Sequence, residues 1–294
     1  MPFVYKDWED LTIRDDFMFK AVMKNAELCK SVLEAILSQP IRDIRYLGEE
    51  LSLKAGYMSK GVRLDVYVED EAHTVYDVEM QVRQEADDVL PKRMRYYQAQ
   101  MDVELLTRGK DYSELPKTLI IFICPFDPCG CGWHLYWFEN TCRRDAALRL
   151  GDEAIKIYLN THGTGEHISP QLQAFMDYVN SGILNPDPLV QALDRQVNEV
   201  KQNETERVSY MKYELNLREQ YKMGKAEGKA EGKAEGKAEG EAEGMAKGRV
   251  EERALMIRVW RMLQEKVAFA EIALKTDLSL QEVQQIAQEC GIAY

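Results

Sequence analysis

The sequence predicts an α/β fold with a mixed central sheet flanked by helices, followed by a C-terminal helical extension. Residues 1–205 alternate between helix-period and strand-period patterns, and residues 118–124 form an apolar run typical of a buried central strand. Residues 224–248 then repeat glycine at every fourth position, and residues 250–294 return to a helix-period composition. We therefore expect an α/β domain over 1–205, a charged helical or flexible linker over 206–249 and a small helical module over 250–294.

Two amphipathic helices are expected at the start of the α/β domain. The first begins at Asp15 and Asp16, whose negative charges stabilise a helix N-terminus, and continues through residues 17–23. The second covers residues 28–36, where apolar side chains recur at intervals of three and four. Both helices present an apolar face that a sheet can cover.

A β-hairpin follows, because residues 62–68 and 74–82 both alternate apolar and polar side chains around a polar turn. A turn centred near Glu71 would pair Asp65 with Asp77 and place Glu79 one diagonal step from Asp65, about 7–8 Å away across the two strands. Carboxylates so placed can share one hard cation such as Mg²⁺, which prefers oxygen ligands. The same pattern also fits a hairpin whose polar face is simply exposed to solvent.

The remaining elements of this domain follow the same periodicities. Apolar residues at steps of three and four predict a helix over 87–106. Strands are expected over 134–138 and 154–159, and helices over 171–178 and 188–201.

Composition is that of a soluble protein, with 45% hydrophobic and 30% charged residues. The chain has no apolar run near the ~20 residues needed to span a bilayer, and its first residues are acidic rather than signal-like. We therefore expect a cytoplasmic protein that does not engage a membrane. The net charge of −12 argues against non-specific coating of nucleic acid, although it is compatible with a site built from carboxylates.

Six cysteines raise the question of a zinc site. Cys129 and Cys131 form a C-x-C pair with Cys124 and Cys142 on either side, but no C-x2-C pair is present. This spacing favours reduced thiols without a metal.

Several short motifs together resemble one known family. They are Asp16-Phe-Met-Phe-Lys20, Leu64-Asp65-Val66, Val78-Glu79-Met80-Gln81, Arg93-x-x-x-Tyr97, Phe122-Ile-Cys124, Asp127-Pro128 and Leu159-Asn-Thr161. In order and spacing they resemble the recombination-promoting nuclease/putative transposase family of the PD-(D/E)XK nuclease superfamily, from about residue 10 to residue 215. The resemblance implies a restriction-endonuclease-like core.

The resemblance also implies roles for individual residues. Asp65 and Glu79 match the two metal-binding acids, and Asp16 matches a further metal contact on the first helix. Gln81 stands where the superfamily usually has a lysine, and glutamine can only form hydrogen bonds. More of the electrostatic stabilisation would then come from the metal or from Arg93, which we expect to contact a DNA phosphate unless it is a plain exposed helix arginine.

The function implied is that of a Mg²⁺-dependent DNA endonuclease with Asp65, Glu79 and Gln81 as its catalytic residues. Promotion of DNA recombination or action on foreign DNA would be its setting. The alternative is a catalytically degenerate nuclease fold that serves as a DNA- or protein-binding module.

The Gly-Lys-Ala-Glu repeat leaves two interpretations open. As a helix it would place lysines beside lysines and glutamates beside glutamates at i, i+4, and each glycine would cost up to about 1 kcal/mol relative to alanine. These costs favour a flexible linker or a fraying helix. The alternative is a helix whose small residues pack against a second copy in a homodimer.

The C-terminal module has the pattern of two short helices around a turn, with Ser279 as N-cap and Glu282 completing a capping box. This outline resembles a helix-turn-helix, but residues 280–289 contain no lysine or arginine to bind DNA. A packing or dimerisation module is therefore favoured.

Overall fold

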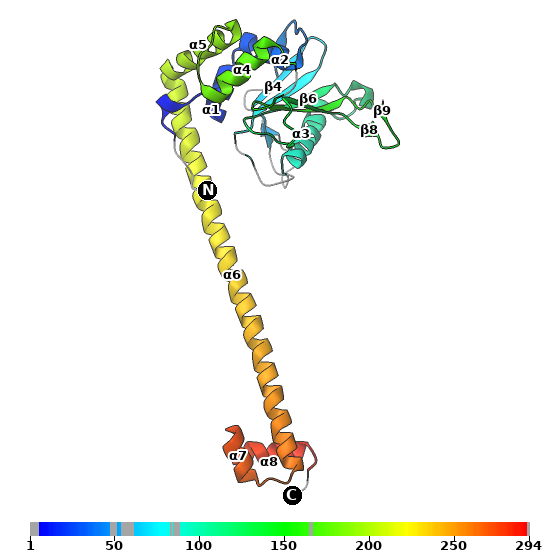
Figure 1. Ribbon diagram of the computed structural model, residues 1–294, viewed down its shortest axis with the longest axis vertical. Helices are drawn as coiled ribbons and strands as arrows, with labels where there is room; N and C mark the ends of the chain where they lie inside the picture. The colour runs from blue at the N-terminus through cyan, green and yellow to red at the C-terminus, as the bar shows by residue number, and fades with distance from the viewer. Residues whose placement is uncertain are drawn as a thin grey trace. The chain divides into compact units, whose positions relative to one another are not determined.

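The computed structural model describes residues 6–47, 52–53, 62–82, 84, 89–164 and 167–292. The chain divides into two compact units, Met1–Leu215 and Asn216–Tyr294. The first unit holds a mixed sheet and the helices that cover it, and the second holds most of a long helix and two short ones (Figure 1).

The main sheet has six strands in the order β1-β4-β5-β6-β10-β7. Their bounds are β1 Ile44–Tyr46, β4 Val66–Asp70, β5 Val75–Met80, β6 Thr118–Cys124, β7 Leu135–Phe138 and β10 Ala154–Asn160. The central strand β6 is parallel to β5 and β10, whereas the other neighbours are antiparallel. The predicted mixed sheet with a buried central strand is confirmed, since every residue of β6 is buried.

Helices cover both faces of this sheet (Figure 1). On one face lie α1 Asp16–Met23, α2 Ala26–Leu37, α4 Pro170–Ser181 and α5 Pro188–Gln202, and on the other lies α3 Val89–Leu105. Short 3-10 helices η1 and η2 span Trp8–Asp10 and Tyr112–Glu114. The helices expected over these segments are confirmed, apart from residues 87–88, which lie outside the described residues.

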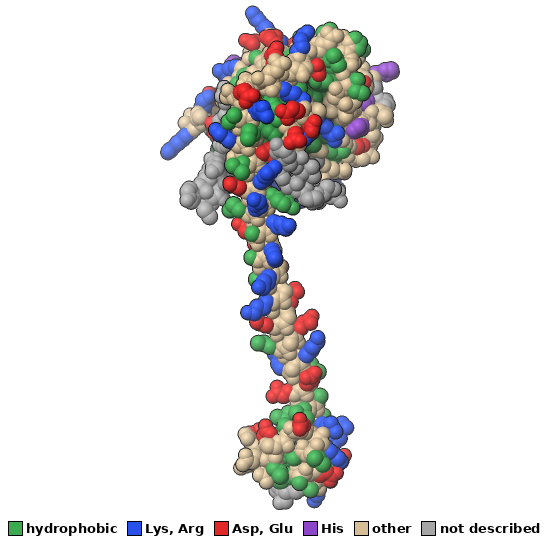
Figure 2. Space-filling view, turned by 90° about the vertical axis from the view of Figure 1, so that its left-hand side faces the viewer, with side chains coloured by type: hydrophobic (Ala, Val, Ile, Leu, Met, Phe, Trp, Pro, Cys, Tyr) green, Lys and Arg blue, Asp and Glu red, His purple; other side chains and the backbone are tan. Residues whose placement is uncertain are grey.

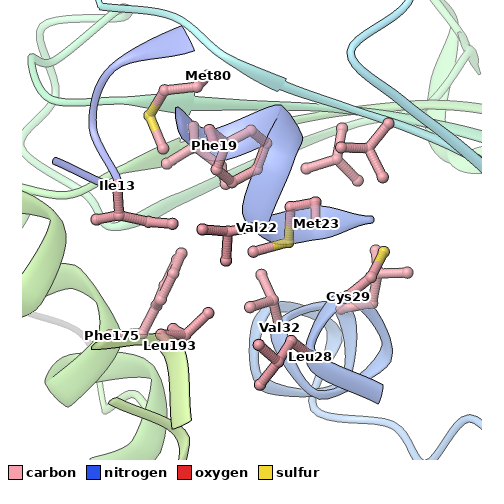
Figure 3. Close-up of a cluster of buried hydrophobic side chains, with 14 of the residues drawn as sticks. Ile13, Phe19, Val22, Met23, Leu28, Cys29, Val32, Met80, Phe175 and Leu193 are labelled. Atoms are coloured by element: carbon pink, nitrogen blue, oxygen red, sulfur yellow. The ribbon is translucent and has the colours of Figure 1, made fainter. Parts of the chain in front are cut away.

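The larger core fixes helix α1 against the sheet (Figure 3). Phe19 and Val22 of α1 are fully buried and lie with Met80 of β5, Phe175 of α4 and Leu193 of α5. Removing a buried phenylalanine side chain typically costs about 3–5 kcal/mol, so this packing strongly determines where α1 lies. The polar residues of the same helix are positioned as a consequence.

The predicted strand over 62–68 is interrupted. Strand β3 (Val62–Arg63) pairs with β2 (Ser52–Leu53), and β4 begins only at Val66, after a bend at Asp65. Leu64 consequently packs in the core beneath α3, whereas Val66 packs in the core on the opposite face. The predicted strict alternation across this segment is therefore wrong at Leu64, and the bend turns Asp65 away from regular strand geometry.

The hairpin of β4 and β5 is confirmed, but its register differs from the prediction. Asp77 pairs with Tyr67, so the predicted pairing of Asp65 with Asp77 is wrong by two positions. The pairing ends at Val66 with Val78, and one residue further on the Asp65 N–H donates to the Glu79 side chain at 2.9 Å. The two acids are therefore closer neighbours than the diagonal arrangement implied.

The turn explains this register. Asp70 Oδ1 accepts the backbone N–H groups of Ala72 and Thr74, both at 2.9 Å. His73 adopts the left-handed conformation with φ of 62°, which few side chains favour. The turn is thus centred on Ala72, one residue later than the alternation alone indicated.

A second two-stranded antiparallel sheet, besides that of β2 and β3, is formed by β8 (Thr141–Cys142) and β9 (Asp145–Arg149). It is exposed, and the sequence pattern did not predict it.

No helix in the part of the chain that the structure describes is both long and apolar enough to cross a bilayer.

Helix α6 (Glu204–Gln264) contains the whole Gly-Lys-Ala-Glu repeat, for which the sequence favoured a flexible linker or a fraying helix. The lysine and glutamate side chains of the repeat lie exposed along the helix (Figure 2). A Cβ atom added at any of the repeat glycines, Gly224 to Gly248, would meet no other atom within 4 Å. No contact among the described residues therefore explains the choice of glycine.

The C-terminal end of α6 packs with α7 (Phe269–Thr276) and α8 (Leu280–Glu289). Buried residues join the three helices: Val259, Leu263, Ile272, Val283 and Ala287. The predicted capping box is confirmed, with Ser279 Oγ accepting the Glu282 N–H and the Glu282 carboxylate accepting the Ser279 N–H.

Candidate functional site

Three acidic residues expected at the site lie in one network. Asp65 and Glu79 are almost fully buried, and the backbone N–H of Asp65 donates to Glu79 Oε1 at 2.9 Å. Lys20 Nζ lies 2.7 Å from Asp65 Oδ1 and 3.1 Å from Asp16 Oδ2. Helix α1, the bend before β4 and strand β5 therefore bring Asp16, Asp65 and Glu79 together.

Arg93 enters the same network from α3 on the other face of the sheet. Its guanidinium donates to Glu79 Oε2 at 2.8 Å, to Gln81 Oε1 at 2.7 Å and to the Tyr97 hydroxyl at 3.0 Å. The guanidinium carbon also lies 5.2 Å and 5.1 Å from the ring centres of Tyr97 and Phe122, within the range of cation–π contacts. Arg93 is thus a half-buried partner of Glu79 and Gln81, and its contact with a phosphate stays a prediction.

Asp77 is a further acid of this site that the sequence placed on the correct strand face but did not assign. Its side chain is fully buried, two residues before Glu79 on β5. Neither carboxylate oxygen has a hydrogen-bond donor among the described residues. Because buried polar groups are normally paired, the orphaned oxygens indicate a site that lacks a positive partner.

The pKa values of the buried acids show the same excess of negative charge. Burial and the Asp77 charge raise the pKa of Glu79 to about 8, with Arg93 opposing. Burial and the Glu79 charge raise the pKa of Asp65 well above its usual value, and burial and the Asp65 charge do the same for the pKa of Asp77. A cation bound among these carboxylates would reverse the effect.

The ionisable groups on α1, in contrast, have pKa values that favour their charged forms. Burial lowers the pKa of Lys20, but the charges of Asp65 and Asp16 outweigh burial and hold it above its usual value. Burial raises the pKa of Asp16, but Lys20 and a 2.7 Å hydrogen bond from the Tyr213 hydroxyl outweigh it and hold that pKa low. Lys20 is therefore a stable cation and Asp16 a stable anion.

Sequence reasoning missed Lys20 and Tyr213 as site residues. Lys20 follows Asp16 by four residues, which places both on one helix face, so a local signal existed. Tyr213 lies in α6, 197 residues from Asp16, and no local pattern could link them.

The donor set fits a hard divalent cation. Asp16, Asp65 and Glu79 offer carboxylate oxygens and Gln81 offers an amide oxygen, the ligand types that Mg²⁺ prefers. Among the described residues, no group of three or more His, Cys, Asp or Glu side chains is arranged around a cation position. Lys20 and Arg93 bind carboxylate oxygens that a cation would use, so cation binding requires these side chains to shift.

The Asp127-Pro128 motif has a structural role. The Asp127 carboxylate accepts the backbone N–H groups of Cys129, Gly130 and Gly132 and the hydroxyl of Tyr136. It therefore organises the loop after β6.

The six cysteines are free thiols.

Comparison with known proteins identifies the segment that carries most of this network. Residues 13–129 match the model of a family described as PD-(D/E)XK nuclease family transposase. No curated protein and no solved structure matches the chain. The matched residues include α1, the hairpin, α3 and β6, and thus every site residue named above except Tyr213. The resemblance inferred from the sequence motifs is confirmed over residues 13–129, which are similar to the PD-(D/E)XK nuclease family transposases.

Proposed function

We propose that this chain is a DNA endonuclease that uses Mg²⁺ to hydrolyse phosphodiester bonds. The observation that carries the proposal is the direct contact between the backbone of Asp65 and the carboxylate of Glu79, with Asp16 joined to them through Lys20. The family description supports nuclease chemistry and DNA as the partner. Promotion of recombination or action on foreign DNA is the setting that we propose for this activity.

In this proposal Asp65, Glu79 and Asp16 would hold the cation, which, when bound, lowers the pKa of a water ligand and offsets phosphate charge. Arg93 fixes the orientation of Glu79 by binding one of its oxygens, while the Asp65 N–H binds the other. The Gln81 amide oxygen accepts from Arg93 and so helps to hold that guanidinium in place. These residues keep both carboxylates oriented before a substrate arrives.

One observation favours a second candidate, a nuclease fold that binds DNA or protein without cleaving. Lys20 and Arg93 already neutralise part of the carboxylate charge, as they would in a site that had lost its metal. The two unpartnered oxygens of Asp77 weigh against this alternative, because a site without a metal has no use for a third buried acid.

Nicking of supercoiled plasmid by purified full-length protein tests the proposal. We expect nicking with Mg²⁺ and none with a chelator, and a loss of about 1,000-fold or more in Asp65→Asn and Glu79→Gln. Glu104→Gln, an exposed acid on α3, is the matched control and should cleave like the wild type. Nicking that survives chelation or both site substitutions would contradict the proposal, and DNA binding without nicking under any divalent cation would favour the second candidate.

A further inference from the structure

The two cations of the site differ in how their donors are used. Arg93 is held by Glu79, Gln81 and Tyr97 and lies against two aromatic rings. A lysine ammonium has three N–H donors. Those of Lys20 bind Asp65 and Asp16, and the described residues provide no partner for the third.

Lys20 is also the more adaptable of the two. Its side chain is 16% exposed, compared with 6% for the Asp65 side chain that it binds, so part of Lys20 reaches solvent beside the buried carboxylates. Its flexible stem allows the charge to move by a few ångströms without rearrangement of α1, which Phe19 and Val22 fix in the core. A bound phosphate could therefore be reached from the position that Lys20 already holds.

The reaction creates a need for such a charge. In hydrolysis the water oxygen forms a bond to phosphorus, and the bond from phosphorus to one sugar oxygen breaks, with its electron pair passing to that oxygen. The proton lost by the water finally resides on the sugar oxygen. Negative charge accumulates on the phosphate as these bonds change, beside the Asp77 carboxylate, whose oxygens have no donor among the described residues.

We infer that Lys20 is a catalytic residue whose ammonium group contacts the phosphate undergoing cleavage and stabilises the charge that develops there. This inference rests on the proposed endonuclease function. Lys20 donates a hydrogen bond and supplies a charge, and it gives up no proton. Because the same ammonium binds Asp65 and Asp16, it also competes with the cation for their oxygens.

Removal of the Lys20 charge should therefore slow cleavage but strengthen Mg²⁺ binding. This combination separates a catalytic role from a merely structural one. Lys20→Gln should slow plasmid nicking at saturating Mg²⁺ by about 100-fold, as loss of one transition-state donor does. The same variant should bind Mg²⁺ more tightly, by about threefold or more in a calorimetric titration, because a competing positive charge is gone. A variant that only damaged the fold would lose both nicking activity and Mg²⁺ affinity.

Lys24→Gln, at the C-cap of the same helix, is the matched control. Lys24 is 59% exposed and pairs with Glu206, away from the buried acids, so nicking and Mg²⁺ affinity should equal those of the wild type. Lys20→Arg retains the charge and should retain more activity than Lys20→Gln. If thermal melting shows that Lys20→Gln is unstable, Lys20→Arg replaces it as the variant that is compared with the wild type.

Each outcome decides between the claims. Wild-type nicking with equal nicking by Lys20→Gln would overturn the role of Lys20 and leave the endonuclease function standing. Slower nicking combined with weaker Mg²⁺ binding would show that Lys20 only supports the fold of the site, and would also overturn the inference. Absence of nicking by the wild type would overturn the proposed function and this inference together.

Discussion

Replacement of Arg93 by methionine tests whether the buried network is as strongly coupled as its geometry indicates. The substitution keeps an apolar stem against Tyr97 and Phe122 but removes every hydrogen bond from the guanidinium to Glu79, Gln81 and Tyr97. Glu79 is buried and, of these contacts, keeps only the hydrogen bond from the Asp65 backbone N–H. Its charge is then largely uncompensated.

The size of the effect follows from the burial of Glu79. Breaking a buried ion pair by removing one partner typically costs about 3–5 kcal/mol in the free energy of unfolding. Burial and Asp77 raise the pKa of Glu79 to about 8 against the opposing charge of Arg93, so this pKa rises further in Arg93→Met. With a pKa of about 8, Glu79 is mostly protonated at pH 7 and mostly ionised at pH 9, so the full cost of the broken ion pair should appear at pH 9 and a smaller cost at pH 7.

Urea denaturation of metal-free protein at both pH values provides the assay. Arg95→Met, an exposed arginine on the same helix, is the control and should change stability by less than about 0.5 kcal/mol. In a double-mutant cycle, Glu79→Gln should recover at least about 1 kcal/mol of the loss caused by Arg93→Met. Equal stabilities of Arg93→Met and Arg95→Met, or a coupling energy of zero, would refute the reasoning.

Three further predictions follow from the same contacts. Without metal ions, the unfolding free energy should fall by several kcal/mol as pH rises from 4.5 towards 8, because folded Glu79, with a pKa of about 8, binds its proton more tightly than unfolded Glu79. Saturating Mg²⁺ should flatten the profile, whereas a flat profile under chelation would contradict this prediction. Tyr213→Phe removes the hydroxyl that donates to Asp16. It should lower the unfolding free energy by about 1–2 kcal/mol and weaken Mg²⁺ binding. An unchanged unfolding free energy together with an unchanged Mg²⁺ affinity would show that this hydrogen bond is unimportant. Alanine at all repeat glycines, Gly224 to Gly248, should raise the helical circular dichroism signal and the melting temperature of the helix. Each exchange stabilises a helix by about 1 kcal/mol and meets no steric obstacle. A loss of helicity would reveal a contact that requires glycine.

Local patterns were sufficient for the elements and for part of the site. Alternation predicted Asp65 and Glu79 on neighbouring strands, and Asp65 lies at the bend just before its strand; the motifs around the two acids indicated the family. The register was wrong because it depends on side-chain hydrogen bonds of Asp70 and on the left-handed conformation of His73, which hydrophobic alternation does not contain.

The cations of the site show where sequence reasoning ends. A lysine on an amphipathic helix is usually a solvated residue, and only tertiary packing of α1 brings Lys20 to Asp65. The link from Tyr213 to Asp16 joins residues separated by 197 positions, beyond the reach of any periodicity. Helix propensity likewise favoured a linker for the repeat, although the structure has it within helix α6.

The central claim is that Asp65 and Glu79 together bind a divalent cation. Calorimetric titration of Mg²⁺ into the full chain tests it without any requirement for DNA. We predict saturable binding to the wild type and a loss of at least about tenfold in affinity in both Asp65→Asn and Glu79→Gln, with Glu104→Gln unchanged. Equal Mg²⁺ affinity in the wild type and the two site variants would contradict the claim.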